Sequence, residues 1–279
     1  RHARAPRVPP RTCGPAGSSS RDIVAKTAAA EEQSGSAPAD AAGTADGARR
    51  IHNFDQRAPV VELTHPALPR TLRVEQRGAT SPGFVQGTSS VAWPVAERLA
   101  RHLCIHPELV RGRSVLELGA GLGLTGAAAA AVGAARAVLT DCQGAMPLLE
   151  RNQARLAEDG VVVEVARVEW GSESDHAAVL GDGPGFDIVL ASDVLVAGFD
   201  TEKLFASCKA LLSRSTSARL LLAYEFREEW GTVGTFIGWA EEAGFEVTHA
   251  PLGASGDHED DSDGDMLLYT FRWPEPLES

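Results

Sequence analysis

Residues 114–126 of the chain read SVLELGAGLGLTG. The first five, Ser114–Leu118, form a short apolar run that predicts a strand buried on both faces of a parallel sheet. Glycines at 119, 121 and 123 follow, and they allow a sharp turn and a close approach of the backbone to a ligand. The alanine-rich residues 125–132 then predict a helix lying close against the sheet. This order is typical of the nucleotide-cofactor crevice of an open α/β sheet.

The rest of the chain continues as an alternation of strands and helices. The further strands that we expect are residues 136–140, 161–168, 186–191, 218–224, 245–249 and 266–272. The expected helices are residues 95–103, with Pro94 in the first turn, and residues 147–158, 201–212 and 232–243. The last two strands have no helix between them, which favours antiparallel pairing. The fold class is therefore α/β: a Rossmann-like, seven-stranded, mostly parallel sheet with an antiparallel last strand.

Two segments precede this sheet. Residues 59–64 (PVVELT) and 71–77 (TLRVEQR) are strand-like runs separated by turn residues, which predicts an N-terminal β-hairpin. Residues 1–21 carry five arginines and no acidic residue, a composition found in organelle transit peptides and in disordered tails. Residues 28–49 contain hardly any large apolar side chain and are expected to be disordered. We therefore expect a tail over residues 1–50 and one domain over residues 51–279.

Composition excludes several classes of function. The formal charge of −12 argues against a protein that holds nucleic-acid phosphates over a broad surface, whereas a basic protein substrate would be attracted. No apolar run approaches the ~20 residues that span a bilayer. The four cysteines are Cys13, Cys104, Cys142 and Cys208. They form no C-x-x-C pair, and no histidine lies at metal-ligand spacing from them. We expect a monomer with reduced thiols, no bound metal and no membrane partner, in the cytoplasm, with a plastid or mitochondrion as the alternative.

The glycine turn departs from the dinucleotide fingerprint G-x-G-x-x-G at two positions. Leu124 stands where the third glycine is expected, and Glu117 precedes the first glycine. A buried carboxylate there would repel a pyrophosphate. S-adenosyl-L-methionine has no phosphate and carries a cationic sulfonium and an ammonium group, so it fits an acidic turn better than NAD does.

Two residues after strand ends are further candidates for cofactor contacts. Asp141 ends the second expected strand, where a carboxylate can accept hydrogen bonds from both ribose hydroxyls. The alternative for Asp141 is a helix N-cap. Trp170 follows the third expected strand and either stacks on the adenine or closes the core.

Taken in order, these motifs resemble the seven-β-strand, S-adenosylmethionine-dependent protein-lysine methyltransferases of the methyltransferase-sixteen family. The matching segments are Trp93-Pro94, LELGAGLGLTG from Leu116, LTD from Leu139, Asn152, EWG from Glu169 and IVLASDVLV from Ile188. The resemblance implies methylation of a lysine side chain of a protein substrate, with S-adenosyl-L-methionine as cofactor. The cofactor-binding residues that we expect are Trp93, Glu117, Gly119, Ala120, Gly121, Asp141, Trp170, Ala191 and Ser192.

Asp193 is the residue that we expect to be catalytic, by holding the acceptor amine. The family commonly has a tyrosine three residues after this aspartate, and here the residue is Val196. Tyr224 and Phe226 are candidates for a replacement aromatic wall beside a cationic amine. The alternatives to a protein-lysine methyltransferase are a small-molecule methyltransferase and a cofactor-binding protein without turnover. The acidic residues 257–265 either attract a basic segment of the protein substrate or form a solvated loop.

Overall fold

The computed structural model describes residues 58–77, 88–196, 198–226, 230–252 and 266–275. The chain divides into two compact units, Arg1–Ala48 and Arg49–Ser279, and every described residue belongs to the second. The expected tail and the acidic residues 257–265 lie outside the described residues. The predictions about them stay predictions.

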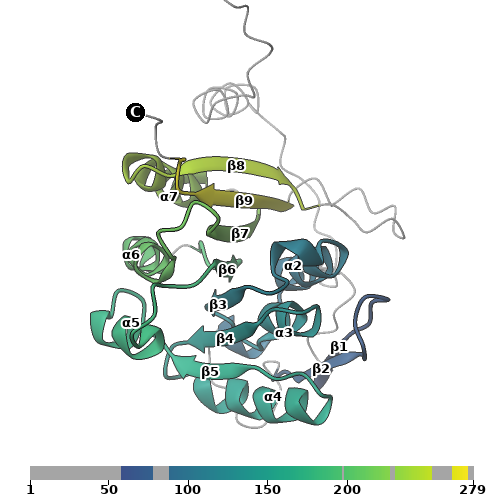
Figure 1. Cartoon of the computed structure of the whole chain (residues 1–279). Helices are drawn as coiled ribbons and strands as arrows, with labels where there is room; N and C mark the ends of the chain where they lie inside the picture. Colours follow the sequence, from purple (N-terminus) through teal and green to yellow (C-terminus); the bar gives the residue numbers. More distant parts are fainter. Residues whose placement is uncertain (1–57, 78–87, 197, 227–229, 253–265, 276–279) are drawn as a thin grey trace, which may run out of the picture. The chain divides into compact units, whose positions relative to one another are not determined.

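A seven-stranded sheet forms the centre of the described residues, in the order β5-β4-β3-β6-β7-β9-β8 (Figure 1). The strands β3 to β7 pair in parallel, whereas β9 pairs antiparallel with both β7 and β8. The bounds are β3 Ser114–Leu118, β4 Arg136–Asp141, β5 Glu164–Arg167, β6 Ile188–Ser192, β7 Arg219–Glu225, β8 Glu246–Pro251 and β9 Met266–Arg272. The predicted fold class, including the antiparallel ending, is confirmed.

The helices of the described residues cover both faces of the sheet (Figure 1). One face carries α2 (Pro94–Ile105), α3 (Leu124–Ala131) and α4 (Met146–Glu158). The other carries α5 (Glu173–Leu180), α6 (Thr201–Leu211) and α7 (Trp230–Glu242). Each face is sealed by its own cluster of buried apolar side chains, because successive strand residues point to opposite faces. In β3, for example, Val115 joins the first cluster and Leu116 the second.

Two elements differ from the sequence prediction. The strand β5 is shorter than expected, and Val162 in the residues before it is 82% exposed. The sequence does not predict helix α5, because its residues ESDHAAVL include few large apolar side chains and so show no apolar stripe at helical spacing. Its start is nevertheless encoded locally, since the Ser172 hydroxyl accepts a hydrogen bond from the Asp175 N–H as an N-cap.

The predicted hairpin is present as β1 (Val60–Leu63) and β2 (Leu72–Glu75), paired antiparallel. Asn152 of α4 joins it to the glycine turn. Its fully buried amide accepts a hydrogen bond from the Glu75 N–H (2.7 Å) and donates to the carbonyls of Glu75 (3.1 Å) and Leu122 (3.0 Å). One side chain therefore fixes the hairpin and the turn relative to each other.

Candidate functional site

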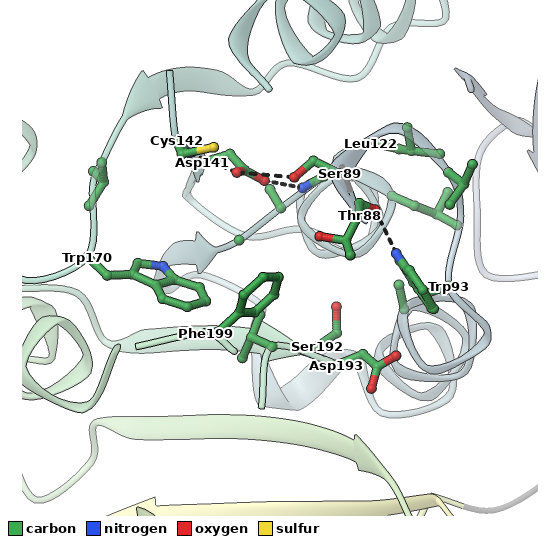
Figure 2. A pocket seen from close by; sticks show the side chains of 18 of the residues that line it. Thr88, Ser89, Trp93, Leu122, Asp141, Cys142, Trp170, Ser192, Asp193 and Phe199 are labelled. Carbon is green, nitrogen blue, oxygen red and sulfur yellow. Dashed lines mark hydrogen bonds between the residues drawn. The ribbon is translucent and has the colours of Figure 1, made fainter. Parts of the chain in front are cut away.

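A cavity of about 570 Å³ lies at the carboxyl ends of β3, β4 and β6 (Figure 2). This volume is within the range of small-molecule sites. From β3 the chain runs outward through β4 to β5, and then returns to place β6 on the other side of β3. The strand order therefore reverses between β3 and β6, and open α/β sheets bind ligands at such a switch point. The short 3₁₀ helix η1 (Thr88–Ser90) and the start of α2 complete the wall.

The glycine turn forms one wall of this cavity. Gly119 has a φ of 68°, and a Cβ there would lie 2.9 Å from Val194 Cγ1 and 3.4 Å from Trp170. Gly121 has a φ of 54°, and its N–H points at the carboxylate of Asp141. Positive φ angles together with this crowding require glycine at 119, since a side chain would enter the cavity.

Leu124 is not a defect of the turn. It is buried in the apolar cluster between α3 and the sheet, and the close approach of helix to strand occurs at Gly126 instead. A Cβ on Gly126 would overlap Cδ2 of Leu139 in β4. The packing role of the third glycine in the dinucleotide fingerprint therefore falls on a residue two positions later.

Asp141 lines the cavity between the Trp170 end and the Trp93 end, and three hydrogen bonds hold its carboxylate (Figure 2). Its Oδ2 accepts the Gly121 N–H at 2.7 Å and its Oδ1 accepts the Cys142 N–H at 2.8 Å, with the Ser89 hydroxyl at 3.4 Å. Burial raises the pKa of this carboxyl, and the two backbone hydrogen bonds oppose that rise. It does not cap α4, whose N-cap is Ala145. A carboxylate has about four lone-pair positions, so one remains free for a ligand diol, and a second becomes available if the diol displaces the long Ser89 contact.

Two aromatic side chains form one end of the cavity. Trp170 and Phe199 meet edge to face, with ring centroids 5.9 Å apart and planes at 79° (Figure 2). Phe199 is 40% exposed although it is apolar. A flat, uncharged ring such as a purine gains stacking energy in such a corner.

Trp93 lies at the other end of the cavity. Its indole Nε1 donates to the Thr88 carbonyl at 2.8 Å, which fixes the ring between η1 and α2 (Figure 2). Pro94 occupies the first turn of α2, as predicted.

Asp193 follows β6 and lies at the same end as Trp93 (Figure 2). Among the described residues it is the one non-glycine residue with a positive φ, 55°. Its N–H donates to the Ala223 carbonyl at 2.9 Å, which continues the pairing of β6 with β7. Aspartate tolerates this conformation better than most residues, and backbone strain of this kind concentrates at functional sites.

Most residues predicted from the sequence come together here. The cavity is lined by Trp93, Gly119, Ala120, Gly121, Asp141, Trp170, Ser192 and Asp193. Ala191 does not line it, because its side chain is fully buried on the face covered by α5 to α7. Tyr224 is buried on that same face, and neither it nor Phe226 lines the cavity. Tyr224 and Phe226, the candidates for a replacement aromatic wall, therefore do not form a wall of this cavity.

The sequence prediction missed several lining residues. Cys142, Glu169 and Val194 are direct neighbours of predicted residues, so adjacency along the chain was the available signal. Phe199 and Lys203 lie beyond β6, where no motif marks them. Ser89 comes from a loop of small polar residues that gave no signal at all.

Glu117 also lies outside the cavity lining, contrary to the prediction. It is 1% exposed, and its Oε2 accepts the Gly126 N–H at 2.8 Å near the start of α3. Burial raises the pKa of this carboxyl to about 8, against the opposing effect of that hydrogen bond. Glu117 is thus mostly protonated at neutral pH, and the argument that its charge selects the cofactor is corrected. It stabilises the turn instead.

Replacing Glu117 with glutamine is expected to remove a pH dependence of stability. The folded-state pKa of about 8 exceeds the ordinary value of 4.5, so the stability linked to protonated Glu117 is complete below pH 4.5 and is lost as the pH rises towards 8. Urea unfolding between pH 5.5 and 8 should show wild type losing up to about 1 kcal/mol per pH unit relative to Glu117→Gln. Exposed Glu164→Gln is the control. Parallel curves for wild type and Glu117→Gln would refute the assignment.

The charges of the cavity favour a cationic ligand over a pyrophosphate. Its described lining carries four carboxyl groups, on Asp141, Glu169, Asp193 and Asp200, and one ammonium group, on Lys203. The Lys203 ammonium is already paired with Asp200 at 3.0 Å. The residues present therefore fit S-adenosyl-L-methionine: an aromatic corner for a purine, a carboxylate for a diol, and an acidic end for a cation.

Two other kinds of site were searched for among the described residues. No group of three His, Cys, Asp or Glu side chains there could hold a metal ion. None of the described helices has the length and apolar character needed to cross a membrane.

Comparison with known proteins places the chain in a family. Residues 71–239, more than half of the chain, match the family model described as lysine methyltransferase. "Histone-arginine methyltransferase METTL23" of Xenopus laevis is 31% identical over 57% of this chain and 66% of its own length. The human protein of that name is 30% identical over 57% of this chain and 81% of its own length. "Protein N-terminal and lysine N-methyltransferase EFM7" of Candida glabrata is 35% identical over 47% and 53%.

The chain thus spans roughly half to two thirds of the Candida and Xenopus relatives. The family assignment confirms the predicted resemblance and, with it, S-adenosyl-L-methionine as the cofactor. The chain belongs to the lysine methyltransferase family.

Proposed function

We propose that this chain methylates the side-chain nitrogen of a lysine in a protein substrate. The observation that carries the proposal is the position of Asp193, which presents a carboxyl group to the same cavity as the glycine turn and Asp141. Family membership and the acidic lining support it.

Each part of the cavity has a role in holding the cofactor under this proposal. Trp170 and Phe199 would hold the purine, Asp141 the ribose hydroxyls, and the turn from Gly119 to Gly121 with Trp93 the amino-acid portion. When bound, S-adenosyl-L-methionine supplies an electrophilic methyl group on a positively charged sulfur.

The acceptor must arrive as a neutral amine, because only that form has a free lone pair. A lysine with an ordinary pKa near 10.4 is neutral for roughly one molecule in a thousand at pH 7.4. Asp193 would bind the lysine as the ammonium form and orient its nitrogen while the proton leaves to water or to the carboxylate. Orientation of this kind supplies much of the rate in a displacement reaction.

Asp193→Asn is expected to lower the rate of methyl transfer by about 100-fold or more while the Kd for S-adenosylhomocysteine changes less than about threefold. Asparagine also tolerates a positive φ, so the backbone should keep its conformation while the charge is lost. Isothermal titration and a single-turnover assay measure the two quantities. The exposed Asp182→Asn is the matched control. An Asp193→Asn enzyme that still methylates at the wild-type rate would exclude Asp193 from the chemistry.

Incubation of the purified chain with methyl-labelled S-adenosyl-L-methionine and a cell extract tests the function itself. Label on a lysine, located by mass spectrometry, is the expected result. Label on an arginine or an N-terminal amine would assign the acceptor classes named for the METTL23 and EFM7 relatives instead. Label only in low-mass products would indicate a small-molecule acceptor. Cofactor binding without any product would indicate a protein without turnover.

The same proposal covers the partner. We expect the acceptor lysine to lie in a basic segment, because the chain carries a formal charge of −12 and its cavity is acidic. We further propose that the enzyme acts as a monomer in the cytoplasm, on proteins rather than on nucleic acids or membranes.

A further inference from the structure

The loop that carries Trp170 is held by side chains from two helices. This loop, residues 168–172, connects β5 to α5. The N–H of Glu169, just before Trp170, donates to Asp175 Oδ2 of α5 at 3.0 Å. The N–H of Gly171, just after it, donates to Ser207 Oγ of α6 at 2.8 Å. The residues on both sides of Trp170 are therefore anchored from outside the loop.

Ser207 is the centre of a buried network. It is fully buried, and its hydroxyl donates to the Lys203 carbonyl at 3.0 Å while accepting from Gly171. His176 Nε2 lies 2.9 Å from the same oxygen. Because a hydroxyl has one hydrogen, which is used on Lys203, His176 must be the donor in that contact. His176 is 6% exposed, and burial lowers its pKa, so it acts as a neutral Nε2–H donor.

The carboxylate of Asp175 is also held in place by a neighbouring side chain. Its Oδ1 is paired with Arg167 at 2.6 Å, which leaves Oδ2 directed at the Glu169 N–H. The indole itself is bounded by the edge-to-face contact with Phe199. None of Asp175, His176 and Ser207 lines the cavity. Asp175 and Ser207 thus hold the loop directly and His176 holds Ser207, while the loop carries the half-buried ring of Trp170.

We propose that Ser207, His176 and Asp175 are positioning residues that fix the orientation of Trp170 for the cofactor, which none of them touches. Apolar side chains at these positions would fill the core without the cost of burying polar groups. Because the loop is already held on both sides of Trp170, the ring loses little conformational entropy when the cofactor binds. The inference rests on the cofactor part of the proposed function and is independent of the acceptor.

A double-mutant cycle with Trp170 tests this inference. Ser207→Ala is expected to raise the Kd for S-adenosylhomocysteine by about fivefold to tenfold, measured by titration calorimetry well below the unfolding temperature. In the Trp170→Ala background the same change should have almost no further effect, because the ring that Ser207 orients is absent. Adenosine should show the same pattern. Ser213→Ala, which removes another buried hydroxyl two residues beyond the end of α6 and outside the cavity lining, should leave the Kd at the wild-type value.

The outcomes separate positioning from a general structural role. An unchanged Kd in Ser207→Ala, or an equal loss with and without Trp170, would overturn the inference. If Ser207→Ala does not fold, His176→Leu and His176→Gln test the same network: leucine should weaken binding and glutamine, which keeps an N–H donor, should restore it. A wild-type chain that binds S-adenosylhomocysteine but methylates no lysine would refute the proposed function and leave this test intact. Failure of the wild type to bind would overturn both.

Discussion

Replacing Asp141 with alanine is expected to weaken the binding of S-adenosylhomocysteine by at least about 100-fold. A charged hydrogen bond contributes about 1.5–3 kcal/mol, and a ribose diol can form two of them with this carboxylate. The substitution also removes the acceptor of the Gly121 N–H, so the glycine turn loses its anchor. Both effects act on the same ligand, and titration calorimetry at pH 7.5 measures their sum.

Two variants make this result specific. Asp141→Asn keeps one oxygen for the Gly121 N–H and should lose less affinity than alanine does. Asp187→Ala is the matched control, because that carboxylate also accepts a backbone N–H, from Ser114, at the amino end of β3 and away from the cavity. The Asp187 variant should bind normally if it folds. Equal losses in the Asp141 and Asp187 variants would show that general destabilisation, and not ribose recognition, explains the effect.

Asn152→Leu is expected to lower the free energy of unfolding by about 3 kcal/mol or more. Leucine has the same branching as asparagine but is bulkier and has no polar atoms, so three backbone groups of Glu75 and Leu122 lose their partner. Each buried polar group left unpaired costs about 1–3 kcal/mol. Urea unfolding monitored by circular dichroism gives the value.

The neighbouring residue supplies the comparison. Gln153 of α4 makes one hydrogen bond, to the Val163 carbonyl, and is only half-buried, so Gln153→Leu should cost less than about 1 kcal/mol. Asn152→Asp keeps the acceptor for the Glu75 N–H but turns a carboxyl towards two carbonyls, and it should be nearly as damaging as leucine. Similar stabilities for Asn152→Leu and Gln153→Leu would show that the hairpin does not depend on this amide.

Position along the chain predicted much of the site, for a physical reason. Asp141 ends β4, and the glycine turn, Trp170 and Asp193 follow the ends of β3, β5 and β6. The carboxyl ends of parallel strands meet at one edge of the sheet. A residue that ends a strand is therefore near the ends of its neighbours even when many residues separate them.

The failures have an equally definite cause. Glu117 and Ala191 lie within strands, where alternation directs each side chain into one of the two helical layers rather than beyond the edge. Tyr224 falls on the same side of β7 as Leu222 and is buried with it. Phe199 reaches the cavity from a loop and Ser89 from the short 3₁₀ helix η1, and no local sequence pattern predicts that such segments lie at the sheet edge.

Cys142 places a thiol in the lining of the cavity. Its thiol is exposed next to Asp141, and partial burial together with that carboxylate raises its pKa. The other described cysteines, Cys104 and Cys208, are buried and have pKa values raised further, to about 11 and about 12. Among the described cysteines, a nucleoside analogue with a mild electrophile near its ribose would therefore be directed to Cys142. Covalent capture there offers a route to selective inhibitors, and protection of Cys142 from alkylation offers an occupancy sensor that needs no knowledge of the acceptor protein.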